Sequence, residues 1–393
     1  MNHRAWVATR KGLFELQRGT AGWAIERVCF LGEPVSMVLP PQGAGRMFAA
    51  LQLGHFGVKV HASDDAGATW HEVATPSYPA QPEGAPGPAW KLMQIWSLEA
   101  AHGTVWAGTL PGGLFRSADG GDSWQLVESL WNRPERLEWF GGGYDAPGIH
   151  SICPHPARHG ELLVGVSCGG VWGSRDDGAT WRLQADGLRA DYMPPEQAGS
   201  PNTQDPHAVV RCAGRPDVLW CQHHNGIWRS TDNAASWQEV RDVPLSHFGF
   251  AVAVHPDDPD RAWFAPAEAD QRRVPLDAAL VVNRTSDGGR SFETLRRGLP
   301  QSQAYDLVYR HGLAISADGA HLLMGAPPAT CGRAKRPATA GRRWRRTCLR
   351  STRSVSAEVK AAECRWRVRI SRPLQFHRRE SAKTVVPVRG SLG

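Results

Sequence analysis

The chain of 393 residues lacks any long apolar run. Its first residues, from Met1 to Phe14, contain no stretch typical of a signal peptide, and no segment approaches the ~18 consecutive apolar residues of a membrane helix. We therefore expect no membrane partner, and we expect the cytoplasm as the compartment.

Cysteine pairs with the close, regular spacing of metal sites are also missing. Cysteines are instead scattered, at Cys29, Cys153, Cys168, Cys212 and Cys221; structural zinc sites need closely spaced pairs. The adjacent histidines at 223 and 224 do not replace such a pair, because neighbouring residues of a strand point to opposite faces. We expect no metal ion and no cofactor.

Positive charge is scarce outside the last part of the chain. The net charge of +7 combines residues 326–393, with 18 Lys+Arg against 3 Asp+Glu, and residues 1–325, with 27 against 35. The first 325 residues thus carry a net charge of −8. A nucleic-acid-binding domain needs a basic face on its fold. We therefore expect no nucleic-acid partner.

What the sequence does contain is an internal repeat of the form Ser/Thr-x-Asp-x-Gly-x-Ser/Thr-aromatic. One match would be a weak signal, but the spacings of 54, 57, 56 and 55 residues between first positions make chance an inadequate explanation. The five copies span residues 63–70, 117–124, 174–181, 230–237 and 285–292, the fourth with Ala234 in place of Gly.

The chemistry of this motif suits a tight hairpin. An Asp accepts hydrogen bonds from nearby backbone N–H groups, Gly supplies a positive φ, and the aromatic residue buries a large apolar surface. Short alternating strands precede each motif, so a period of about 50 residues with four strands predicts one blade of a β-propeller. We assign a structural role to five carboxylates: Asp65, Asp119, Asp176, Asp232 and Asp287.

The number of blades follows from counting these units. Residues 5–28 form a first unit with a degenerate motif, the five motifs supply five more, and strands at Tyr305–Tyr309 and His321–Gly325 begin another. We therefore predict an all-β propeller over residues 1–325 with four-stranded antiparallel blades. Seven blades, the last incomplete, are expected, and six are the alternative.

The repeat stops after Gly325. Arginine becomes dense, and the alternation of apolar and polar residues ends. We interpret residues 326–393 as a disordered, Arg-rich tail created by a frameshift, and the alternative is a native basic extension. Resequencing the gene through this region distinguishes the two.

The five motifs resemble the Asp boxes of the bacterial neuraminidase repeat, found in sialidases and in bacterial glycosyl-hydrolase-like propellers. The resemblance implies a glycan as ligand or substrate. Sialidases use a tyrosine nucleophile, carboxylates and an arginine cluster, but their Phe/Tyr-Arg-Ile-Pro motif is absent here and the chain has only five tyrosines. Hydrolysis therefore stays an open hypothesis.

Two alternatives to a glycan-directed function remain. Assembly factors of photosystem II carry the same kind of repeat, so a non-catalytic scaffold that binds a protein partner is one of them. Binding of a small anion by Lys59, Arg272 and Arg273 is the other. A pair of carboxylates about 5–10 Å apart in the central pocket would favour hydrolysis.

We expect a pocket at the propeller face opposite the Asp boxes, where loops within and between blades converge on the channel. The residues with the chemistry for catalysis there are Asp306, Tyr305, Glu268 and Asp270. The residues with the chemistry for binding are His55, Lys59, His150, His207, His223, His224, Arg272 and Arg273, and each histidine could instead have a structural role.

Overall fold

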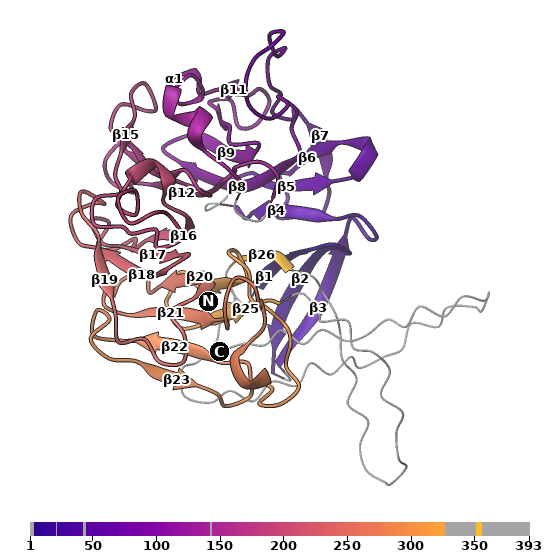
Figure 1. The fold of residues 1–393 in the computed structure, drawn as a ribbon. Coiled ribbons are helices and arrows are strands. Elements are labelled where there is room, and N and C mark those ends of the chain that lie inside the picture. The colour runs from indigo at the N-terminus through magenta and orange to yellow at the C-terminus, as the bar shows by residue number, and fades with distance from the viewer. Residues whose placement is uncertain (1–3, 21, 42–44, 142–143, 327–350, 356–393) are drawn as a thin grey trace.

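The computed structural model describes residues 4–20, 22–41, 45–141 and 144–326, and the backbone of residues 351–355. Six four-stranded antiparallel sheets are arranged in a ring (Figure 1). The predicted β-propeller is confirmed. The described helices are all short: α1 (Glu128–Trp131) and the 3₁₀ turns η1 (Gly54–Phe56), η2 (Pro134–Glu138), η3 (Pro201–Thr203) and η4 (Leu276–Ala278).

Each blade is a meander whose strands follow one another in sequence, except that the first blade takes its innermost strand from near the C-terminus. The first three blades contain β26 (Ser351–Val355), β1 (Arg4–Thr9), β2 (Gly12–Gly19) and β3 (Gly22–Cys29); β4 (Val35–Leu39), β5 (Met47–Gln52), β6 (Val58–Ser63) and β7 (His71–Val73); and β8 (Gln94–Ala101), β9 (Thr104–Leu110), β10 (Leu114–Ser117) and β11 (Gln125–Leu126).

The next three blades repeat this order without exchange. They contain β12 (Ile149–Pro154), β13 (Leu162–Val166), β14 (Gly170–Ser174) and β15 (Arg182–Leu183); β16 (Pro206–Arg211), β17 (Leu219–His223), β18 (Gly226–Ser230) and β19 (Gln238–Val240); and β20 (Gly249–Val254), β21 (Ala262–Pro266), β22 (Val282–Thr285) and β23 (Glu293–Leu295).

The prediction of seven blades is met only in part, because the described residues form six complete blades. A two-stranded sheet of β24 (Leu313–Ile315) and β25 (Leu322–Met324) follows the sixth. The prediction of a strand at Tyr305–Tyr309 is wrong. That segment buries Leu307 and Val308 against the sixth blade without pairing as a strand, and β24 begins only at Leu313.

The ring is closed by β26, which pairs antiparallel with β1 and contacts both β4 and β24 (Figure 1). This strand lies inside the segment predicted to be a disordered tail. One strand of the first blade therefore lies beyond the predicted end of the propeller at residue 325. Residues 327–350 and 356–393 lie outside the described part of the chain, and the frameshift hypothesis stays a prediction.

All five motifs join the third strand of a blade to the fourth, and they share one hydrogen-bond pattern. In the first, Thr69 N and Oγ1 donate to the Asp65 carboxylate at 2.8 and 2.7 Å, and Gly67 N donates to Ser63 Oγ at 2.7 Å. The fourth copy keeps the pattern with Ala234 at φ 65° in the position of the glycine. The box carboxylates therefore act within their own turns, because both oxygens are occupied there.

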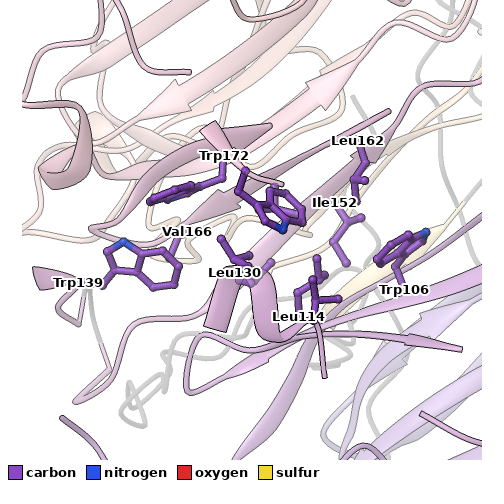
Figure 2. Close-up of a cluster of buried hydrophobic side chains, with 12 residues drawn as sticks. Trp106, Leu114, Leu130, Trp139, Ile152, Leu162, Val166 and Trp172 are labelled. Atoms are coloured by element: carbon purple, nitrogen blue, oxygen red, sulfur yellow. The ribbon is translucent and has the colours of Figure 1, made fainter. Parts of the chain in front are cut away.

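The core lies between neighbouring blades. In Figure 2, Trp106 and Leu114 of the third blade meet Ile152, Leu162 and Trp172 of the fourth. Leu130 of α1 fills the space between them, so the short helix belongs to this core. The predicted burial of the box aromatic residues is confirmed at Trp181 and Trp237, which are 5% and 3% exposed, whereas the aromatic residues of the other three boxes are only half-buried. Face-to-face packing of this kind holds each blade at a fixed angle to the next.

Candidate functional site

The inner strands share an irregularity near their first residues. Each of the six paired inner strands shifts register there, so that an extra residue bulges out of the ladder. A bulge turns a side chain away from its regular direction. The described side chains at these bulges are Ser36, Trp96, His150, His207 and Phe250.

Four of these side chains and Arg310 form a contact layer that we call the axial layer: Trp96, His150, His207, Phe250 and Arg310. His207 stacks on Phe250 at 4.4 Å between ring centroids, and Trp96 meets the edge of His150 at 5.7 Å. The Arg310 guanidinium lies 4.9 Å from the Trp96 centroid and 5.6 Å from that of Phe250. Because these rings belong to the third and sixth blades, Arg310 reaches across the channel.

Arg310 is the most unusual member of the axial layer. The side chain is 7% exposed, and its Nε and Nη2 have no hydrogen-bond partner among the described residues. Burial lowers the pKa of Arg310, and the charge of Asp205 opposes this effect. A buried guanidinium with donors left over is costly, so such a group usually serves a ligand or a buried carboxylate.

A cavity of about 390 Å³ lies against this layer. It runs along the inner strands β8, β12, β16 and β20 and along β24, from His150 and Arg310 to Pro156 and Ala213. The last two residues follow the ends of inner strands, at the rim that also carries the Asp boxes. The cavity therefore extends away from the face where the loops were expected to form a pocket.

The polar lining of this cavity is mostly hydroxyl and cationic. Ser97, Ser151, His150 and Arg310 all contribute, and Glu99 is the only acid among the described residues that line it. His150 is buried, its Nδ1 lies 2.9 Å from Ser151 Oγ, and its Nε2 has no partner in the described part of the chain. Burial, and next Arg310, hold the pKa of His150 well below its usual value. The imidazole is therefore neutral at physiological pH.

A second polar group surrounds Asp205, in the segment before β16. Asp205 Oδ2 lies 3.3 Å from His207 Nε2 and 3.4 Å from His224 Nδ1. The other oxygen, Oδ1, accepts the backbone N–H of Cys168 at 3.1 Å. Burial raises the pKa of Asp205, but His207 and Arg310 outweigh this effect and hold it well below its usual value. Asp205 is therefore a buried carboxylate anion.

The structure brings together four of the predicted histidines. His150 and His207 belong to the axial layer, and His224 joins Asp205. His223 turns the other way, with its ring 4.8 Å from that of Trp228 in the core of the blade. Burial lowers the pKa of His223 to about 3, and its Nε2 lies 3.0 Å from Asp205 N. His223 thus positions Asp205 as a neutral group.

The predicted cations each have a carboxylate neighbour. Lys59 Nζ lies 2.6 Å from Glu72 on the outer strand β7, and Arg272 Nη1 lies 2.6 Å from Glu268 in the same loop. Arg273 pairs with Asp270. These pairings also occupy the two predicted catalytic acids of that loop, Glu268 and Asp270, so each of the five predicted groups has a partner of opposite charge.

Three predicted residues lie apart from these pairs. His55 is exposed in η1, with its ring 3.9 Å from that of Phe56, and does not line the cavity. Tyr305 is 48% exposed and Asp306 is half-buried next to it. Their catalytic role stays a prediction.

Arg310, Asp205 and Trp96 were not predicted from the sequence. Asp205 lies two residues before His207, and Arg310 directly follows the segment Tyr305–Tyr309, so both are close in sequence to residues that were predicted. Trp96 carried no such signal, because a tryptophan in an inner strand is typical of a propeller core. Bulges cannot be read from a single sequence.

The sequence matches no protein-family model and no curated protein. The fold is similar to solved β-propellers. One is the GH74 xyloglucanase from Xanthomonas campestris, at 18% identity and a TM-score of 0.55 over 83% of this chain and 50% of that one. Another is the GH74 enzyme of Niastella koreensis, at 15% identity and a TM-score of 0.53 over 83% and 50%. This chain thus spans about half the length of these enzymes.

A different kind of propeller matches over most of its length. YCF48 bound to a D1 peptide is 16% identical, with a TM-score of 0.50 over 83% of this chain and 87% of that one. YCF48 from Cyanidioschyzon merolae is 14% identical, with a TM-score of 0.51 over 82% and 88%. Similarity at this level establishes the fold as a β-propeller. The neighbours include glycoside hydrolases and a peptide-binding protein, so they leave the function open.

Proposed function

We propose that the protein binds a small carboxylate-bearing ligand, such as an acidic sugar, in the cavity of its central channel. The observation that carries this proposal is the buried Arg310 with two donors that no described residue accepts. A guanidinium presents its donors in a fixed fork that matches a carboxylate in two parallel hydrogen bonds. A ligand carboxylate would therefore accept hydrogen bonds from donors that have no acceptor in the described part of the chain.

The rest of the cavity fits a hydroxylated ligand. Its volume of about 390 Å³ lies within the range of small-molecule sites. His150 Nε2 and the hydroxyl groups of Ser97 and Ser151 supply neutral hydrogen-bonding positions along the lining. The resemblance of the repeats to Asp-box propellers of the sialidase superfamily supports a sugar as the ligand.

Binding is favoured over hydrolysis. A glycosidase needs two carboxyl groups on either side of the scissile bond, whereas Glu99 is the only acid in the described lining. Glu268 and Asp270 have arginine partners in their own loop. A hydrolase with Asp306 and Tyr305 at the other face stays the catalytic alternative.

A non-catalytic scaffold is a second candidate function, and two exposed tyrosines next to the axial layer favour it. Tyr144 and Tyr309 are 45% and 40% exposed, and each packs on a ring of the axial layer, Trp96 and Phe250 respectively. Exposed tyrosines of this kind suit the binding of a peptide or a sugar ring.

We further propose that β24 and β25 are the inner half of an incomplete seventh blade, since β24 contacts both β20 and β26.

The test is a thermal-shift comparison of matched sugars on the full chain. Glucuronate and N-acetylneuraminate are each compared with a neutral counterpart, glucose or N-acetylmannosamine. We expect at least one acid to raise Tm while its neutral counterpart does not. If no acidic sugar stabilises the protein but peptides do, the scaffold is correct and the proposal is wrong.

A further inference from the structure

We propose that Asp205, His207 and His224 bind one divalent transition-metal ion, with Zn²⁺ or Fe²⁺ as the natural candidates. The three ligand atoms, Asp205 Oδ2, His207 Nε2 and His224 Nδ1, all lie within 4.8 Å of one another. Two imidazoles and one carboxylate are a ligand set that proteins use for both ions. This site is separate from the cavity lining, so it does not depend on the ligand proposed there.

The separations of Asp205 Oδ2 from the two histidine nitrogens fit a shared ion better than direct hydrogen bonds. Metal–ligand distances of about 2.0–2.2 Å place neighbouring ligand atoms of a tetrahedral site about 3.4 Å apart. The two measured separations from Asp205 Oδ2 are 3.3 and 3.4 Å. Charge-assisted N–H···O bonds are shorter, at about 2.7–2.9 Å.

The neighbouring groups hold each ligand in a metal-binding orientation. His207 Nδ1 lies 2.6 Å from the carbonyl oxygen of Gly249, and an N–H donated there leaves the lone pair of Nε2 directed at Asp205. Histidines that bind metals commonly fix their second nitrogen in this way. The Asp205 Oδ1 atom is occupied by the Cys168 N–H, which leaves Oδ2 for the ion.

The backbone also fixes Asp205 against the turn that carries His224. His224 N donates to Asp205 O at 3.0 Å, and the Asp205 N–H lies 3.0 Å from His223 Nε2. The ligands therefore come from two segments that are bonded together before any ion binds. Such preorganisation lowers the entropy cost of binding.

The site is enclosed but accessible from one side. Asp205 and His207 are buried, and His224 is 22% exposed. The rings of Phe248 and Tyr192 flank His224, at 5.6 and 5.0 Å between centroids. Three protein ligands leave a fourth position for water or another ligand, as in metal sites that bind substrates.

The test is a Co²⁺ titration of the metal-stripped full chain, followed by visible absorption, with Zn²⁺ as competitor. We expect one Co²⁺ per chain with the spectrum of a four- or five-coordinate ion, displaced by one equivalent of Zn²⁺. The variant His224→Ala should bind at least tenfold more weakly, because a ligand is lost. The control His55→Ala removes an exposed histidine that also lies between the second and third strands of a blade, and this variant should bind like the wild type.

Folding effects are separated by a second variant and a second measurement. Asp205→Asn preserves the shape of the side chain and should also weaken Co²⁺ binding, with an unchanged far-ultraviolet dichroism spectrum for each variant compared. Absence of a bound ion in the wild type, or equal affinity in wild type and His224→Ala, would overturn the proposal. The acidic-sugar experiment fails or succeeds independently, since its readout requires no metal.

Discussion

Individual residues decide where the propeller tolerates change, and the two glycines of the third blade's Asp box illustrate this. Gly121 has φ 93°, and a Cβ atom there would lie 2.4 Å from Cε1 of the buried Phe48. Gly120 has φ 73°, but a Cβ atom there would meet no atom within 4 Å. At the Cα of Gly121 the box thus packs directly on the preceding blade, whereas Gly120 contacts that blade only through its carbonyl oxygen, which accepts a hydrogen bond from Arg46 at 3.0 Å.

These two positions make a matched pair for a stability measurement. Gly120→Ala should cost about 1 kcal/mol of unfolding free energy, because only the left-handed backbone is strained. Gly121→Ala should cost a further ~1–3 kcal/mol, because Phe48 must move as well. Urea unfolding of both variants measures the difference. Equal losses would show that the box does not depend on contact with Phe48.

Arg310 shows how a single residue can matter for function without a sequence signal. Its donors are unsatisfied among described residues, while every cation chosen from the sequence has a carboxylate neighbour. Sequence reasoning selects charged residues by loop position. It cannot tell which of them the fold will neutralise, because the partners lie on other strands or in loops of unknown conformation.

At the scale of the element, the Asp box was fully predictable and the inner strand was not. The box is a local structure: its Asp, Ser/Thr and Gly meet within eight residues, so spacing alone determines the turn. The inner strands β12 and β16 carry bulges at His150 and His207, and these bulges depend on pairing with the next strand. The prediction of a strand at Tyr305–Tyr309 is wrong for the same reason, because pairing with a neighbouring strand cannot be read from the segment itself.

The contrast between local and non-local structure also applies to the proposed metal site. The sequence argument against a metal rested on His223 and His224 pointing to opposite faces, which the structure bears out for these two residues. His224 meets Asp205 and His207 instead, which come from the preceding inner strand and the segment before it. A ligand set assembled from a turn and a bulge has no fixed sequence spacing.

The Asp boxes as a set predict how stability depends on pH. Hydrogen bonds from Ser and Thr lower the pKa of Asp65 and of Asp287 to about 2, below the ~3.9 of an unfolded chain. Between about pH 2 and about pH 4, the native state therefore binds fewer protons than the unfolded state. The stabilisation is present above about pH 4 and is lost as pH falls towards 2.

Denaturant unfolding at several pH values between 2 and 6 measures this dependence. The free energy of unfolding should fall steeply below pH 4. Asp287→Asn should be less stable at pH 7 but should show a shallower fall, because one titrating group is removed. An unchanged pH slope in this variant would mean that the box carboxylates do not carry the acid sensitivity.

At the scale of the whole molecule, the ring depends on a strand from the far end of the chain. The inner strand of the first blade is β26, and it contacts β4 on one side and β24 on the other. A propeller in which a late strand of the chain pairs into the first blade resists opening, since that strand must separate from β1 before the ring can open. The blade architecture followed from the repeat spacing, but this closure did not, since residues 351–355 carry no repeat signal.

Two truncations test the closure. A chain that ends at residue 350 lacks β26 and should have a lower Tm and a less cooperative transition than the full chain. A chain that ends at residue 355 keeps β26 and should unfold like the full chain. Differential scanning calorimetry makes the comparison. Identical transitions for the two truncations would show that β26 does not close the ring.

The central claim is that Arg310, which is buried and has two donors without a partner among the described residues, binds an anionic ligand. Isothermal titration of the best acidic sugar into wild type and into Arg310→Met tests it most directly, with the unfolding free energy of each ligand-free protein measured alongside. We predict that Arg310→Met abolishes binding while the ligand-free protein is as stable as the wild type or more so, because methionine fills the space without a buried charge. Unchanged affinity in Arg310→Met, or a loss of several kcal/mol of stability in the ligand-free variant, would contradict the account and assign Arg310 to the structure of the channel.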